Sequence, residues 1–126
     1  MKKLFLVYLM MLAGSAWAEW EYIAESEVAS LWVDPSTIKK NGSRRKVWGI
    51  TALISPDKFG ALSYRWQEEY DCKEEQARYL ALSSHSEHFA KGKTINVNDS
   101  IPKDAPWFPV APRTMQSDVM KFVCPK

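Results

Sequence analysis

The chain has 126 residues, with 17 Lys and Arg against 15 Asp and Glu, and carries a formal net charge of +2. Two of these cations, Lys2 and Lys3, belong to an N-terminal leader, so the remainder of the chain is close to neutral. Domains that bind nucleic acid are normally basic, which argues against nucleic acid as a partner. The length is typical of a single domain.

Residues 1–18 have the order of a secretory signal peptide. A positively charged start precedes the apolar run 4–12, and Ala16-Trp17-Ala18 matches an A-x-A cleavage site. We expect cleavage between Ala18 and Glu19, which leaves residues 19–126 as one domain. The apolar run is too short to span a bilayer, and we expect no transmembrane segment in the mature chain. Because residue 19 is not cysteine, we also expect no lipid anchor.

The two cysteines, Cys72 and Cys124, both lie in the mature part of the chain. An even number of cysteines in an exported protein favours a disulfide over two free thiols. A redox pair is the other alternative, but the chain has no C-x-x-C, which argues against thioredoxin-like chemistry. A disulfide that closes so long a loop is worth roughly 4 kcal/mol in the chain-entropy description.

Short apolar runs at 20–24 and 28–33 predict the first two strands. The segment 34–37, which begins Asp-Pro, favours a type I turn or a single helical turn. Asn41-Gly42 is the strongest hairpin signal of the chain and introduces a strand over 45–55. Both rows of that strand are largely apolar, which is typical of a central strand covered on two sides.

The next strand, 61–72, alternates more cleanly. Its apolar row contains Trp66 and Tyr70, and its polar row runs from Ser63 to Asp71. Residues 76–86 predict a further strand, for which a helix is the alternative. After Ala90 the pattern loosens, and four prolines prevent regular structure between 102 and 112.

The last element is a helix. Thr114 can cap it, and Met115, Val119, Met120 and Val123 recur at helical spacing. The predicted fold class is therefore α+β: an antiparallel sheet of about five to six strands with a short C-terminal helix tied to the sheet by the disulfide.

Several motifs occur in an order that resembles a known family. They are Val33-Asp34-Pro35-Ser36, Glu69-Tyr70-Asp71-Cys72 and the block from Trp107 to Cys124. In their order and spacing they resemble the surface-adhesin protein E family of Gram-negative bacteria, over nearly all of the mature chain. The resemblance implies a small antiparallel sheet with a helix held by a cystine. It also implies a non-enzymatic surface protein that binds host matrix proteins. The leader differs from that of a lipoprotein-anchored adhesin, because it lacks the lipid-accepting cysteine.

Neither catalysis nor a metal site is indicated. Glu68 and Glu69 point to opposite faces of a strand, so we interpret them as charges on the edge of a sheet rather than as an acid–base pair. His85 and His88 are the only histidines, and two ligands are too few for a closed zinc site. We interpret both as polar surface residues, with no metal and no cofactor.

Two groups of residues are candidates for binding. The first is the local excess of positive charge around the predicted turn: Lys39, Lys40, Arg44, Arg45 and Lys46. These cations could bind a sulfated polysaccharide, a lipid phosphate or an acidic protein patch. The alternative is that they only solvate the turn and keep an edge strand from aggregating. The second is Trp107 with Phe108, which either latches the proline-rich loop or docks a partner. Trp48 and Trp66 lie on apolar rows and are expected in the core.

The sequence thus predicts an exported, non-catalytic binding protein, periplasmic or associated with the outer membrane or cell surface. Its partners would be host extracellular-matrix proteins or an envelope protein, and its edge strands could support a homodimer. The alternative is a periplasmic structural or stress-related envelope protein that has no host ligand.

Overall fold

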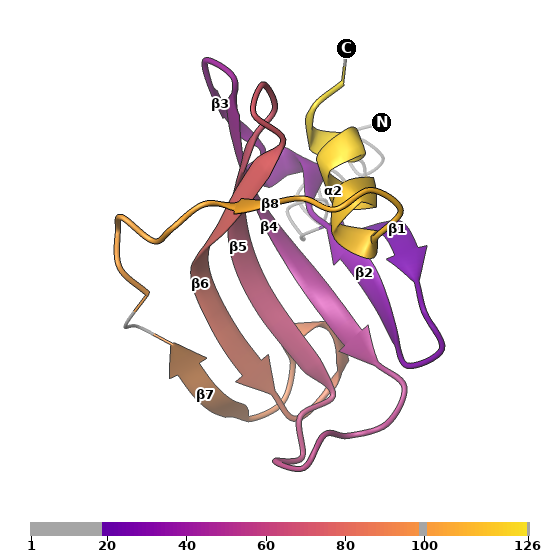
Figure 1. The fold of residues 1–126 in the computed structure, drawn as a ribbon. Coiled ribbons are helices and arrows are strands. Elements are labelled where there is room, and N and C mark those ends of the chain that lie inside the picture. The colour runs from indigo at the N-terminus through magenta and orange to yellow at the C-terminus, as the bar shows by residue number, and fades with distance from the viewer. Residues whose placement is uncertain (1–18, 99–100, 126) are drawn as a thin grey trace, which may run out of the picture.

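One antiparallel sheet crossed by a C-terminal helix forms the structure, a computed structural model that describes residues 19–98 and 101–125 (Figure 1). The strands follow the order β1-β2-β4-β5-β6-β7, while β3 pairs with β4 and β8 pairs with β6. The elements are β1 (Glu21–Glu25), β2 (Ala29–Val33), η1 (Pro35–Thr37), β3 (Lys39–Asn41), β4 (Arg44–Leu53), β5 (Ser63–Asp71), β6 (Gln76–His85), η2 (His88–Ala90), β7 (Thr94–Asn98), β8 (Phe108–Pro109) and α2 (Met115–Val123). The predicted fold class is confirmed, with two very short strands added to a path of six.

The turns between the first strands form as the local chemistry indicates. Asp34 caps η1, because its Oδ1 accepts hydrogen bonds from the Ser36 backbone N–H at 3.0 Å and the Ser36 hydroxyl at 2.7 Å. The β3–β4 hairpin turns at Gly42-Ser43, one residue later than the predicted Asn41-Gly42. Gly42 has a φ of +61° at the first turn position, a conformation that costs glycine little.

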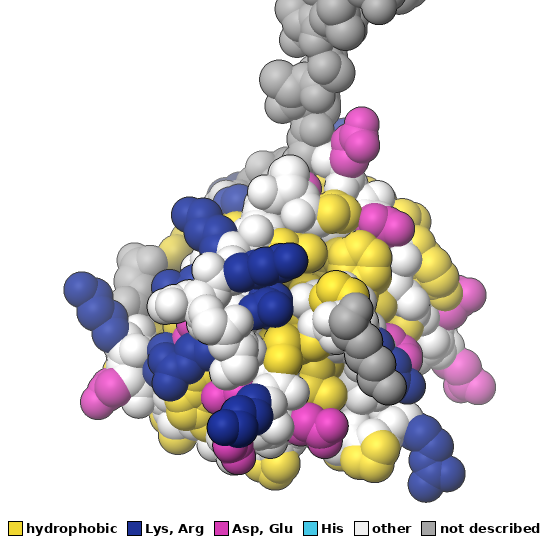
Figure 2. Space-filling model, turned by 90° about the horizontal axis from the view of Figure 1, so that it is seen from above, with side chains coloured by type: hydrophobic (Ala, Val, Ile, Leu, Met, Phe, Trp, Pro, Cys, Tyr) yellow, Lys and Arg dark blue, Asp and Glu magenta, His cyan; other side chains and the backbone are white. Residues whose placement is uncertain are grey.

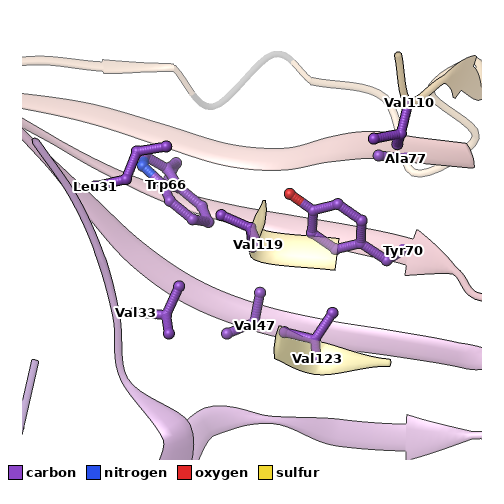
Figure 3. Close-up of a cluster of buried hydrophobic side chains, with 9 residues drawn as sticks. All are labelled: Leu31, Val33, Val47, Trp66, Tyr70, Ala77, Val110, Val119 and Val123. Atoms are coloured by element: carbon purple, nitrogen blue, oxygen red, sulfur yellow. The ribbon is translucent and has the colours of Figure 1, made fainter. Parts of the chain in front are cut away.

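Helix α2 lies across one side of the sheet, which we call the helix side (Figure 1). Its buried residues Val119 and Val123 pack with strand residues that alternate toward it (Figure 3). The full buried cluster is Leu31, Val33, Val47, Trp66, Tyr70, Ala77, Val110, Val119 and Val123. The predicted disulfide is present: Cys72, after β5, is bonded to Cys124, the C-cap of α2, across a separation of 52 residues. It fixes the end of the helix to the end of the central strand.

Two sequence expectations require correction. The strand β7 was not predicted, because it is a short edge strand whose five residues are all exposed and no buried face marks it. The polar row of β5 is also not uniformly solvated. Ser63 is fully buried because its hydroxyl donates to the Glu87 carbonyl at 2.6 Å and accepts from the Ala90 N–H at 3.0 Å. The η2 segment therefore covers part of the second side of the sheet, which we call the opposite side.

Across the described residues, no helix combines the length and apolar character needed to cross a membrane.

Candidate binding surface

The β3–β4 hairpin presents the predicted cluster of cations. Its register places Lys39 opposite Lys46 and Lys40 opposite Arg45. Four of the five cations are exposed, and Arg45 is half-buried. Like charges directly opposite each other on paired strands are destabilising. Because the fold gains nothing from these pairs, the arrangement favours a role outside the fold.

The pleat of β4 divides the cluster between the two sides of the sheet. Arg44 and Lys46, with Lys39 across the hairpin, lie on the opposite side, whereas Lys40 and Arg45 lie on the helix side. Arg45 is held locally, since its Nη1 donates to the Gly42 carbonyl at 2.8 Å and to the Arg44 carbonyl at 2.9 Å. The cations on the opposite side are therefore the ones that can act together with other strands.

Trp107 joins that group from the far end of the chain. The guanidinium carbons of Arg44 and Arg78 lie 5.1 Å and 4.5 Å from the centroid of the Trp107 ring. Both distances are in the range of cation–π contacts, in which arginine is the commoner cation. The structure thus brings together two candidates that the sequence placed more than sixty positions apart, and it adds Arg78, which only the β5–β6 register could reveal.

Phe108 and Trp107 have different surroundings. Phe108 packs against the buried cluster and lies 5.4 Å from Tyr79, measured between ring centroids. Trp107 is half-buried beneath the two arginines. Phe108 thus has the contacts of a loop latch, while Trp107 lies among the cations.

We call Arg44, Arg78 and Trp107, with the neighbouring Lys39 and Lys46, the cation–tryptophan platform. Seen from the end of the molecule that carries β3 and α2, Lys and Arg side chains gather beside apolar surface (Figure 2). A guanidinium group stacked on a ring can still donate its N–H groups to anionic oxygens, as Arg78 does to Glu69. The platform is therefore suited to a ligand that combines anionic groups with a flat apolar face.

Two carboxylates lie beside the platform, and both are already engaged. Glu69 is bonded to Arg78, with Oε1 accepting from Nη2 at 2.6 Å and from Nε at 2.8 Å. Asp71 accepts the backbone N–H groups of Lys73 and Glu74, each at 3.1 Å. These backbone hydrogen bonds, the one from Glu74 first, hold the pKa of Asp71 below its ordinary value. Glu69 lies opposite Lys46 and Asp71 opposite Arg44, but no lysine of the platform forms an ion pair among the described residues.

The interpretation of Glu68 and Glu69 as sheet-edge charges is wrong. Strand β5 lies inside the sheet, between β4 and β6, and the two residues are 6% and 3% exposed. They do point to opposite sides: Glu69 reaches Arg78, and Glu68 reaches Gln116 of α2. No pattern in the sequence distinguishes a buried glutamate from a solvated one when its partners come from distant segments.

The two histidines have separate partners. His88 Nε2 lies 2.7 Å from the Leu53 carbonyl oxygen. His85 is buried rather than on the surface as predicted, and its Nε2 lies 2.8 Å from the Ser83 hydroxyl. Burial, and then the charge of Arg65, lower the pKa of His85. In the part of the chain that the structure describes, no three His, Cys, Asp or Glu residues cluster as metal ligands.

The two tryptophans expected in the core differ. Trp66 is 4% exposed and belongs to the buried cluster. Trp48 is half-buried on the opposite side of the sheet, where the guanidinium of Arg65 lies 4.2 Å from its ring centroid.

Comparison with known proteins places this architecture among characterised folds. A family model described as surface-adhesin protein E matches residues 20–125. A crystal structure of Haemophilus influenzae protein E, crystal form II, is similar with a TM-score of 0.59 at 13% identity, over 81% of this chain and 91% of that one. The selenomethionine form of the same protein gives a TM-score of 0.60 at 15% identity, over 82% and 84% of the two chains. Among curated proteins, none matches the sequence.

Proposed function

Because this chain belongs to the surface-adhesin protein E family, we propose that it is an exported, non-catalytic binding protein. It attaches to sulfated polysaccharide of the host extracellular matrix through the cation–tryptophan platform. The observation that carries this proposal is the stacking of Arg44 and Arg78 on Trp107, beside lysines that form no ion pair among the described residues.

A sulfated polysaccharide fits this surface better than a compact acidic protein. Its sulfate oxygens accept hydrogen bonds from the forked N–H donors of arginine, and its sugar rings present apolar faces that pack on an indole. The near-neutral charge of the mature chain gives little long-range attraction, so binding depends on this local cluster and weakens with added salt.

Chromatography on immobilised heparin, a sulfated polysaccharide, tests the proposal. The triple variant R44S/R45S/K46S should elute at a clearly lower salt concentration than the wild type. The matched control is K58S/K91S/K93S, which removes the same charge from exposed lysines away from the hairpin. Equal elution of all three proteins, or an equal shift in both variants, would show that the hairpin has no specific role.

The tryptophan is tested separately from charge. Trp107→Leu preserves the net charge and an apolar side chain but removes the ring on which Arg44 and Arg78 stack. We expect weaker retention on heparin with an unchanged unfolding midpoint. Retention identical to that of the wild type would show that Trp107 has no role in binding and that the cations act only through their charge.

The proposal also requires export to the cell surface. The predicted signal peptide, residues 1–18, lies outside the described residues, so its cleavage and the final location are part of the proposal. Protease treatment of intact cells, compared with spheroplasts, tests them. Digestion on intact cells supports adhesion. Protection until the outer membrane is opened would contradict adhesion and favour an envelope partner or a structural role in the periplasm.

The edges of the sheet supply a route to a homodimer, which we include in the proposal. Among the described strands, β1 and β7 end the path of the sheet, and all residues of β7 are exposed. An exposed edge can pair with the same strand of a second copy. Light scattering should then give twice the monomer mass for the wild type. Val97→Pro in β7 should lower the measured mass to that of the monomer. A monomeric wild type over the whole concentration range contradicts this part of the proposal.

A further inference from the structure

A groove on the helix side of the sheet is separate from the cation–tryptophan platform and has a different set of side chains. Its volume is about 460 Å³, and it is lined by strand residues of β2, β4, β5 and β6 and by the first turns of α2. The lining consists of Leu31, Thr51, Tyr64, Trp66, Glu68, Tyr70, Tyr79, Leu82, Met115, Gln116 and Val119. It therefore contains four aromatic rings and one carboxylate, and no lysine, arginine or histidine.

The carboxylate of Glu68 is incompletely partnered. The Tyr70 hydroxyl donates to Oε2 at 2.5 Å, and Gln116 Nε2 donates to the same oxygen at 3.0 Å. Among the described residues Oε1 has no hydrogen-bond partner, and it keeps access to solvent although the residue as a whole is only 6% exposed. A buried carboxylate without a counter-charge is costly, so an anion placed in this way favours a cation as its missing partner.

The aromatic rings complete the pattern. Trp66 and Tyr70 lie along the floor formed by β5, and the Tyr70 hydroxyl points toward the Trp66 end of the cluster (Figure 3). Tyr79, on the neighbouring strand β6, is 47% exposed at the groove. Faces of tryptophan and tyrosine attract organic cations, and aromatic surroundings of this kind recognise quaternary ammonium groups.

We propose that this groove is a binding site for a small quaternary ammonium ligand, whose cationic head contacts Oε1 of Glu68, the exposed ring of Tyr79 and the part of Trp66 that lines the groove. The site lies on the other side of the sheet from the cation–tryptophan platform, so the two proposals stand or fall independently. The remaining apolar lining, including Leu82 and Met115, accommodates the methyl groups of the head.

The protonation state of Glu68 makes the affinity depend on pH. Burial raises the pKa of Glu68, while the hydrogen bonds from Tyr70 and Gln116 act in the opposite direction. The phenols of Tyr70 and Tyr79 lie near it, and burial raises their pKa values. The guanidinium of Arg45 in β4, opposite Tyr70, is the nearby cation. Neither phenol changes charge in the acidic range. The cation should therefore bind more tightly as pH rises and Glu68 loses its proton.

The test uses choline as the probe, with 3,3-dimethylbutan-1-ol as its uncharged isostere, titrated into ¹⁵N-labelled protein by NMR. The indole N–H of Trp66, which donates to Thr51 Oγ1 at 3.0 Å, is the reporter at the site. We expect saturable shifts with choline, tighter binding at pH 7 than at pH 4, and binding weaker by roughly tenfold to a hundredfold for the isostere.

Two variants separate the site from general effects. Glu68→Gln keeps the shape and an acceptor for Tyr70, and it should weaken choline binding roughly tenfold or more and remove its pH dependence. Tyr79→Leu removes one exposed wall and should also weaken binding, with the thermal midpoint of each variant measured alongside. The proposal is overturned if choline fails to shift the Trp66 reporter, if the isostere binds equally well, or if Glu68→Gln binds choline as the wild type does. R44S/K46S, which changes only cations on the opposite side of the sheet, should in contrast bind choline normally.

Discussion

The indole ring of Trp66 in β5 lies directly on Gly49 in β4, so closely that a Cβ atom at Gly49 would overlap the ring. The backbone of Gly49 is held between two neighbours, paired with Val33 of β2 and with Trp66 itself. The absence of a side chain at this position is therefore what allows a tryptophan to lie flat in the core.

Gly49→Ala should lower the free energy of unfolding by about 1–3 kcal/mol, the usual effect of overpacking a core. Urea unfolding measures it. The matched comparison is the same change in a Trp66→Leu background, where the overlapping ring is gone and Gly49→Ala should cost clearly less. An equal loss in both backgrounds would show that the ring is not the cause.

Removal of the Cys72–Cys124 disulfide should destabilise the protein by about 4 kcal/mol, because the loop of 52 residues is then unrestrained in the unfolded chain. The double variant C72S/C124S, unfolded in urea, gives the value. Reductant should lower the wild type to the same midpoint and leave the variant unchanged. A variant as stable as the oxidised wild type would contradict the prediction.

The start of α2 depends on a reciprocal cap. Thr114 Oγ1 accepts from the Ser117 N–H at 3.1 Å, and Ser117 Oγ accepts from the Thr114 N–H at 3.1 Å. Thr114→Ala should cost about 1 kcal/mol of unfolding free energy, whereas Thr114→Ser, which keeps the hydroxyl, should cost much less. Thermal unfolding compares the two variants, and equal losses would show that the hydroxyl is not what matters.

The raised pKa of Glu68 predicts the sign of a pH effect on stability. Above the unfolded value of 4.5, the unfolded chain has released a proton that the folded protein still holds, so stability falls as pH rises through the folded pKa. Glu68→Gln has no ionisable group at this position and so lacks this pH-dependent contribution to stability. The stability of the wild type relative to Glu68→Gln should therefore decrease from about pH 4.5 upward.

Unfolding free energies of both proteins across this range provide the measurement. Asp57 and Asp71 have lowered pKa values and act in the opposite direction, stabilising the fold above their unfolded pKa and less so in acid. They are present in both proteins and cancel in the difference. A difference that is constant or increases with pH would contradict a raised pKa for Glu68.

Local chemistry in the sequence was sufficient to predict most of the helices, strands and turns. The turn signals at Asp34-Pro35 and Gly42, the alternation along β5 and the helical spacing from Met115 to Val123 each depend on residues close in the chain. The disulfide could also be predicted, because an exported chain with two cysteines has one possible pairing. These features determine an antiparallel sheet with a tied helix before any tertiary contact is known.

Tertiary structure alone decided which side chains meet. Arg78 reaches Trp107, and Glu68 reaches Gln116 across 48 positions, because strand register and helix placement bring distant segments together. Glu68 and Glu69 are buried for the same reason, because Gln116 and Arg78 reach them from other segments of the chain. The sequence by itself thus determined the elements and their covalent tie, while the platform and the groove exist only in the assembled sheet.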